Sequence, residues 1–293
     1  MTTDLPARVT DRLTPDEVAA VLALAAAAHR ADGVAPLSED GLLGLSESRV
    51  HLLVSAADGL TGYAYLNDGS GELVVDPGHR RRGYGSALLA ATAAEADGRE
   101  RRFWAHGDDP GARAFAQRAG FRRARVLWQL RRPLTEPIPD VPLPDGVTLR
   151  PFRPGVDEAA WLAVNARAFA HHPEQGRWTA HDLALREAEP WFDPAGFLLA
   201  VDPRDTLLGF HWTKVHPASG IDPALGEVYV LGVDPDGHRR GLGAALTVAG
   251  LRYLAGRGLT AVLLYVDESN AAAVALYRRL GFTVHATDVM YAG

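Results

Sequence analysis

Two nearly identical stretches determine how this sequence is interpreted. Residues 75–89 read VDPGHRRRGYGSALL, and residues 233–246 read VDPDGHRRGLGAAL. In each copy a run typical of a strand leads into a glycine pair, and a run that favours a helix follows. Glycines allow the backbone to turn so that several N–H groups converge at the positive end of the helix dipole. Each stretch therefore predicts a strand, a phosphate-binding loop and a helix.

Arginines beside both glycine pairs add positive charge for phosphate oxygens. One such loop could equally be a tight turn with solvated arginines, but two copies in the same context favour phosphate binding. Other phosphate loops fit less well. The sequence has no Gly-x-x-x-x-Gly-Lys-Ser/Thr, and no Gly-x-Gly-x-x-Gly followed about twenty positions later by an acidic residue. These absences argue against a nucleotide triphosphatase and a dinucleotide-binding fold.

The repeat divides the chain into two halves. When the Asp-Pro pairs are aligned, Gly83 and Gly85 coincide with Gly241 and Gly243, and a later Gly-Phe pair also recurs. A proline-rich segment between the halves indicates an extended linker. We therefore expect an N-terminal domain over residues 1–135, a linker over 136–146 and a C-terminal domain over 147–293, each long enough to bury its own core.

Both halves predict the same alternation of strands and helices, which indicates an α/β fold with a mixed sheet in each domain. In the first half, Thr14 and Glu17 form a capping box around Pro15 and predict a helix that ends near Gly33. The other elements expected in the first half are strands at 49–57, 60–67, 71–76, 101–106 and 124–130 and helices at 86–96 and 111–119. In the second half the expected strands are at 147–152, 196–202, 206–216, 227–233, 261–267 and 282–291. The expected helices are at 157–170 and 270–280, with a third directly after the glycine loop.

Composition limits the class of protein. With 47% apolar and 23% charged residues the chain is an ordinary globular one, and its net charge of −6 argues against a general nucleic-acid binder. The absence of cysteine excludes a disulfide framework and a thiolate nucleophile. No apolar run is long enough for a membrane span, and the start has no signal pattern. We therefore expect a cytoplasmic monomer with no membrane or nucleic-acid partner. We expect no bound metal, because the histidines lack the spacing of a metal site.

The loops, with the run Asn270 to Phe282 that reads Asn-x-x-Ala-x-x-x-Tyr-x-x-x-Gly-Phe, resemble the GCN5-related N-acetyltransferases. The resemblance covers both halves and implies tandem domains of that fold with acetyl-CoA as co-substrate. It implies that each loop holds the pyrophosphate and that the preceding strand pairs with the pantetheine arm. In the second half the implied residues are Leu231, Gly232, Val233, His238, Arg239, Arg240, Gly241, Leu242, Gly243, Ala244, Asn270, Ala271, Ala272, Ala273, Val274 and Ala275. In the first half they are Leu73, Val74, Val75, Arg81, Arg82, Gly83, Tyr84, Gly85 and Ser86. His238 departs from the family, which prefers Gln or Arg there.

Acetyl transfer from a thioester to an amine needs a base for the amine and an acid for the departing thiolate. The resemblance implies that Tyr277 is the acid and that Glu227 acts as the base through a water molecule. In the first half, Ala116 and Gly69 occupy the matching positions, and Glu72 lies in a different register on the opposite face of its strand. We therefore expect the second domain to catalyse the reaction by direct attack and the first to be non-catalytic.

Longer strings narrow the resemblance to the tandem acetyltransferases of mycothiol biosynthesis in actinomycetes. They are APLSE, HPEQGRWT, HWTKVH, GEVYVLGVDP and LYVDESNAAAVALYRRLGF. That family acetylates the cysteinyl amine of Cys-glucosaminyl-inositol in the last step of mycothiol synthesis. By the resemblance, the acceptor is contacted by Glu39, Glu174, Lys214, Glu227 and Tyr265.

Each of these residues has an ordinary structural alternative. Glu39 and Glu174 could be surface carboxylates. Tyr265 could fill the core, and Tyr277 could simply pack on a helix face. Lys214 is the single lysine among 30 basic side chains, which suggests a site for a compact ammonium, although chance could also leave one. The alternative functions are an N-acetyltransferase of an aminoglycoside or of a protein N-terminus, and an acyl-CoA-binding module without turnover.

Overall fold

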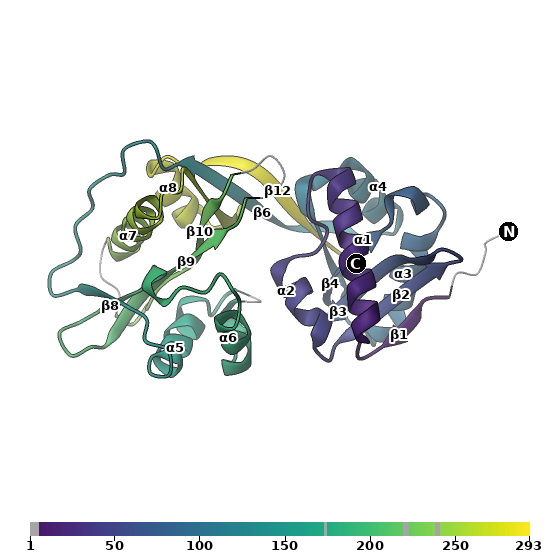
Figure 1. Ribbon diagram of the computed structural model, residues 1–293, viewed down its shortest axis with the longest axis horizontal. Helices are drawn as coiled ribbons and strands as arrows, with labels where there is room; N and C mark the ends of the chain where they lie inside the picture. The colour runs from purple at the N-terminus through teal and green to yellow at the C-terminus, as the bar shows by residue number, and fades with distance from the viewer. Residues whose placement is uncertain (1–5, 173–174, 219–222, 238–240) are drawn as a thin grey trace. The chain divides into compact units, whose positions relative to one another are not determined.

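The computed structural model describes residues 6–172, 175–218, 223–237 and 241–293. The chain forms two compact units (Figure 1). Unit 1 contains Met1–Leu127 together with Ala286–Gly293, and unit 2 contains Trp128–His285. This division differs from the expected domain boundaries at two places. The C-terminal segment 286–293 groups with the first half of the chain, and residues 128–146, the end of the expected N-terminal domain with the linker, group with the second.

Unit 1 follows the order of elements expected for the first half, with two short additions. Its strands are β1 (Arg8–Thr10), β2 (Val50–Ala56), β3 (Gly59–Asn67), β4 (Ser70–Val75), β5 (Arg102–Ala105) and the last residues of β12 (Thr283–Ala292). Its helices are α1 (Pro15–Asp32), α2 (Glu39–Leu43), α3 (Tyr84–Glu95) and α4 (Pro110–Arg118), with 3-10 helices at Gly44–Ser46, Pro77–His79 and His106–Asp108. The sequence patterns predict neither β1 nor α2.

The strands of unit 1 lie in the order β1-β2-β3-β4-β5-β12. All neighbours are antiparallel except β4 and β5, which are parallel. Leu53 of β2 packs in the cluster that contains α1, and Leu52 packs with Leu88 of α3. Because successive side chains of a strand point to opposite faces, α1 and α3 cover opposite faces of the sheet. The predicted capping box of Thr14 is present, and α1 ends next to Gly33 as predicted, with Gly33 in a left-handed conformation.

Unit 2 repeats this order. Strand β6 (Arg122–Pro133) begins in unit 1 and ends in unit 2. The other strands of unit 2 are β7 (Thr148–Pro151), β8 (Phe197–Val201), β9 (Leu207–His216), β10 (Leu225–Val233) and β11 (Ala261–Asp267). Its helices are α5 (Glu158–Ala168), α6 (Ala180–Glu187), α7 (Leu242–Gly256) and α8 (Ala271–Arg279), with 3-10 helices at Gln175–Arg177 and Pro194–Gly196. None of the helices in the described ranges combines the length and apolar character needed to cross a bilayer.

The strands of unit 2 lie in the order β6-β11-β10-β9-β8-β7. Strand β10 is parallel to β11, whereas β10, β9, β8 and β7 are successively antiparallel. Trp161 of α5 and Leu183 of α6 pack with Trp212 of β9 on one face. Leu251 of α7 packs with Val228 of β10 on the other face, where α8 also lies. Two helices therefore cover each face, and the β10–β11 pair lies near the middle of the sheet.

The proline-rich segment 136–146 lies against unit 2. Ile138 and Val141 pack against the core cluster that contains α7. The Arg252 guanidinium of α7 donates to the Pro139 carbonyl at 3.4 Å and to the Asp140 carboxylate at 2.8 Å. Proline keeps the segment extended without internal hydrogen bonds, and its few apolar side chains are enough to hold it on the helix.

Candidate active site

Strands β10 and β11 separate partway along their length. Their parallel register ends at Val228, whereas β10 stays paired with β9 as far as Val233. A bulge directly after Val228 marks the point of separation, because an extra residue bends the strand. In the described residues, the backbone groups of Leu231 and Val233, which face β11, have no strand partner. An extended amide chain could bind there as an added strand would.

The second glycine loop leads into the first turn of α7. Gly241 precedes the helix with φ of +85°, a left-handed conformation that glycine adopts without strain. Intrahelical hydrogen bonding begins at Ala245, whose N–H donates to the Gly241 carbonyl at 3.1 Å. The amides of Leu242, Gly243 and Ala244 therefore have no intrahelical acceptor and can bind an anion. Three further residues predicted for this loop lie outside the described residues: His238, Arg239 and Arg240.

The predicted run 270–275 forms the start of α8. Asn270 is the N-cap residue, and its side chain accepts a hydrogen bond from the Ala273 amide at 3.1 Å. In unit 1, Asp109 caps α4 in the same way, because its carboxylate accepts from the Ala112 amide at 2.8 Å. Side chains with a short polar oxygen are preferred at this position. The two units therefore share a capped helix that follows the strand parallel to β4 or β10.

Glu227 and Lys214 lie directly opposite each other on β10 and β9. Both are nearly buried, with 6% and 9% of their surfaces exposed. Val228, the next residue, packs with α7, so Glu227 points to the opposite face, which α5 and α6 cover. The structure thus brings two of the predicted acceptor-binding residues together, beside the point where β10 and β11 separate.

Aromatic rings surround the Lys214 ammonium. Its Nζ atom lies 4.3 Å from the centre of the Trp191 ring and 5.1 Å from that of Tyr229, which is the geometry of a cation–π interaction. The Tyr229 hydroxyl accepts from Arg186 Nε at 2.8 Å, and the Arg186 guanidinium lies 3.9 Å from the Trp178 ring centre. None of these partners of Lys214 is among the predicted site residues, because they come from segments far apart in the chain.

His216, which is not among the predicted site residues, is bonded to Glu227. Nε2 of His216 lies 2.6 Å from Oε2 of the carboxylate. His216 follows Lys214 by two residues on β9, and the period of two in a strand places both side chains on one face. That spacing within HWTKVH is the signal from which the histidine could have been identified.

Tyr277 is buried on the other face of the sheet. It belongs to the core cluster of α7, α8 and β11, and its ring lies edge-on to Phe282 with 5.7 Å between centres. Burial raises the pKa of its hydroxyl to about 12, because desolvation disfavours the phenolate. Tyr277 thus packs in the core, as its structural alternative predicted. This packing is compatible with the predicted role of general acid, because the hydroxyl keeps its proton at neutral pH.

The other predicted acceptor residues lie in different surroundings. Tyr265 is 45% exposed, which contradicts the core alternative for it. Its hydroxyl accepts from Gln129 Nε2 at 2.8 Å. Glu39 is the first residue of α2 in unit 1 and is partly exposed. Glu174 lies outside the described residues.

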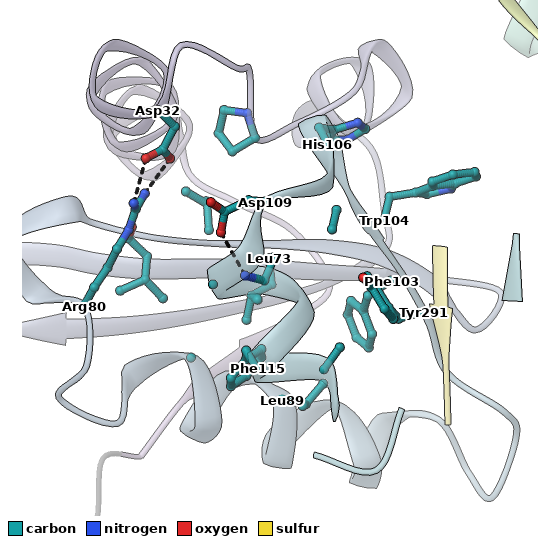
Figure 2. A pocket seen from close by; sticks show the side chains of 18 of the residues that line it. Asp32, Leu73, Arg80, Leu89, Phe103, Trp104, His106, Asp109, Phe115 and Tyr291 are labelled. Atoms are coloured by element: carbon teal, nitrogen blue, oxygen red, sulfur yellow. Dashed lines mark hydrogen bonds and ion pairs between the residues drawn. The ribbon is translucent and has the colours of Figure 1, made fainter. Parts of the chain in front are cut away.

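Unit 1 contains a cavity of about 850 Å³ at the place that matches the second loop (Figure 2). Strands β4 and β5 separate after Gly71, as β10 and β11 do, and Gly83 has φ of +96°, like Gly241. Beside the loop, Arg80 makes two hydrogen bonds of 2.7 Å to Asp32. The predicted residues that line the cavity are Leu73, Val74, Val75, Arg81, Gly83, Tyr84, Gly85 and Ser86, and Arg82 is absent from its lining.

A charged network borders this cavity. His106, which lines it, bonds through Nε2 to Glu72 at 2.9 Å and through Nδ1 to Asp288 at 3.1 Å. Burial alone would lower the pKa of His106, but hydrogen bonds to Asp288 and Glu72 outweigh it and raise the pKa to about 10. Glu72 also accepts from the Ser38 amide at the start of α2. Both oxygens of the Glu72 carboxylate, behind the cavity-lining His106, therefore already have hydrogen-bond partners.

Comparison with known proteins agrees with this geometry. The acetyltransferase (GNAT) family model matches residues 162–282, and an acetyltransferase (GNAT) domain model matches residues 47–123. Mycothiol acetyltransferase of Salinispora arenicola is 61% identical, covering 96% of this chain and 95% of that protein. The Thermobispora bispora mycothiol acetyltransferase is 58% identical, covering 97% and 98%.

Solved structures show the same architecture. A GCN5-related N-acetyltransferase from Sphaerobacter thermophilus superposes with a TM-score of 0.69 at 27% identity, covering 99% of this chain and 96% of that one. A tandem GNAT protein from the clavulanic acid biosynthesis pathway superposes with a TM-score of 0.73 at 21% identity, covering 98% of both, which shows a common fold. The chain therefore belongs to the mycothiol acetyltransferases, a group of tandem GCN5-related N-acetyltransferases.

Proposed function

We propose that this chain transfers acetyl from acetyl-CoA to the cysteinyl amine of Cys-glucosaminyl-inositol, and that unit 2 carries out the chemistry. Family membership makes the chain an acetyl-CoA-dependent N-acetyltransferase of mycothiol biosynthesis. The observation that carries the assignment to unit 2 is the pair Glu227 and Lys214 beside the separated strands. A carboxylate and an ammonium there offer a base and a cation to a polar acceptor.

Acetyl-CoA binds along β10 and at the start of α7. The backbone of Leu231, Gly232 and Val233 pairs with the amides of the pantetheine arm, and the first amides of α7 hold the pyrophosphate. His238, Arg239 and Arg240 belong to the same loop in sequence and add charge. This arrangement places the thioester where β10 and β11 begin to separate, next to Glu227.

The reaction proceeds by direct attack. Glu227, through a water molecule, takes a proton from the cysteinyl ammonium, whose ordinary pKa of about 8 makes a carboxylate–water pair a sufficient base. The amine nitrogen attacks the thioester carbonyl, the carbon–sulfur bond breaks, and Tyr277 gives its proton to the sulfur of coenzyme A. The nitrogen loses its second proton as the amide forms, and that proton passes through water to the Tyr277 phenolate and restores the phenol. The two groups lie on opposite faces of the sheet, so each reaches a thioester held in the gap from its own side.

Unit 1 binds coenzyme A without turnover. Its cavity and glycine loop support a phosphate and pantetheine site. Chemistry there lacks an acid, because Ala116 stands at the position that matches Tyr277, and Glu72 is held by His106 and the Ser38 amide. The resemblance also predicts acceptor contacts for Glu39, Glu174 and Tyr265, which remain predictions.

Release of coenzyme A from acetyl-CoA in the presence of Cys-glucosaminyl-inositol tests the proposal. Aminoglycosides and peptides with a free N-terminus serve as competing acceptors, and the Glu227→Gln variant serves as the catalytic control. Turnover confined to the inositol conjugate and reduced at least about 100-fold in Glu227→Gln is the expected result. Faster turnover on another amine would reject the acceptor, and full activity of Glu227→Gln would reject the base.

A further inference from the structure

We infer that His216 is a positioning residue for the reaction, because it fixes one oxygen of the Glu227 carboxylate and leaves the other for the water that deprotonates the acceptor. The inference rests on the proposed function, since it needs Glu227 as the base. The observation is the 2.6 Å separation between His216 Nε2 and Glu227 Oε2. A separation this short holds one proton between the two atoms, and a carboxylate that acts as a base must be the acceptor of that hydrogen bond.

The two partners differ in their exposure to solvent. The Glu227 side chain is 8% exposed, whereas that of His216 is 35% exposed. The imidazole therefore approaches the carboxylate from the open side of the site, and Glu227 is bonded at Oε2 alone among the described residues. Oε1 then remains for a water molecule. A side chain that can rotate freely would spend little time with either oxygen aligned to that water.

The other charged groups on this face do not substitute for the imidazole. Lys214, opposite Glu227, has its ammonium against the Trp191 and Tyr229 rings. Arg186, from α6, has its Nε bonded to the Tyr229 hydroxyl. Because neither of these cations bonds to Glu227 among the described residues, the hydrogen bond from His216 is the contact that sets the orientation of the base.

Two substitutions at one position separate positioning from packing. His216→Phe keeps an aromatic ring and removes the donor, whereas His216→Gln keeps an amide N–H donor of similar reach. We expect His216→Phe to lower kcat about tenfold with the KM for acetyl-CoA unchanged, and His216→Gln to recover most of the loss. Equal kcat values for the two variants and the parent protein would overturn the inference. The exposed His29→Gln on α1 of unit 1 is the matched control, and thermal unfolding of all variants should coincide.

Combination with Glu227→Gln distinguishes failure of the inference from failure of the proposed function. If His216 acts through Glu227, His216→Phe lowers kcat in the parent protein but has no further effect in the Glu227→Gln background. An undiminished effect of His216→Phe in that background would mean an independent role and would overturn the inference alone. Full activity of Glu227→Gln by itself would reject Glu227 as the base, and with it both that step of the proposed mechanism and the role of His216.

Discussion

The hydroxyl of Tyr277 is buried, and burial determines when it can give up its proton. Because desolvation raises its pKa to about 12, the phenol stays protonated across the range in which the enzyme works, and a basic limb near pH 9 cannot come from its ionisation. We expect Tyr277→Phe to lower kcat by about 100-fold, the usual contribution of a general acid, with the Kd for acetyl-CoA unchanged. Steady-state kinetics and calorimetric titration measure the two quantities.

Tyr253→Phe is the matched control for that prediction. It removes one hydroxyl from α7 in the same unit, where Tyr253 bonds to Asp193. A normal kcat in Tyr253→Phe and a reduced kcat in Tyr277→Phe would show that the loss is due to proton donation by Tyr277 and not to removal of any tyrosine hydroxyl from this unit. A normal kcat in Tyr277→Phe would remove Tyr277 from the mechanism and leave it as the partner of Phe282 in the core.

His106 should make stability depend on pH in unit 1. Its pKa is raised to about 10 in the folded chain, against about 6.5 in the unfolded chain. A base with a raised pKa contributes stability that is fully present below the unfolded value and is lost as pH rises through the folded value. The difference in free energy of unfolding between the parent protein and His106→Gln should therefore be largest below pH 6.5 and shrink between pH 6.5 and 10. A difference that is constant over this range in denaturant titrations would contradict the charged network.

At the scale of elements, α7 can approach β9 closely only because residue 250 is glycine. A Cβ atom there would overlap the imidazole of His211, which is fully buried and donates through Nδ1 to the Leu246 carbonyl. We expect Gly250→Ala to destabilise the protein by about 1–3 kcal/mol through overpacking. Gly256→Ala, at the end of the same helix and with open space around its Cβ, should change stability by at most about 1 kcal/mol. Equal stability of the two variants would contradict the close contact.

Local signals explain which elements could be predicted from the sequence. The capping box at Thr14, the glycine turn before α7 and the helix that follows Asn270 each depend on a few neighbouring residues, so the sequence pattern predicts them. Helix α2 is too short for a periodic pattern, and Tyr265 alternates with apolar neighbours yet lies exposed. Partners from distant segments, such as Trp191 with Lys214, follow only from the tertiary fold.

At the scale of the whole molecule, both ends of the chain build unit 1. The division of the chain assigns Ala286–Gly293 to that unit, where β12 pairs with β5. No local feature of the sequence reveals this, because a strand's partner is decided by long-range packing. Val289 and Tyr291 pack with Phe103 in the core of unit 1, and Tyr291 lines its cavity. The proposed coenzyme A site of the first half therefore depends on residues at the end of the second.

A chain that ends at His285 tests this dependence. In this shortened chain β5 would lose its pairing with β12, and His106 would lose its ion pair with Asp288. The cavity would lose Tyr291 from its lining. We expect the number of acetyl-CoA molecules bound in calorimetric titration to fall from about two per chain to about one, because unit 2 keeps its own loop and strands. Val284→Ser, an exposed change in the same strand, should leave the stoichiometry intact. Two molecules bound by the shortened chain would show that unit 1 does not need the segment, and loss of both would contradict the division of the chain into two units.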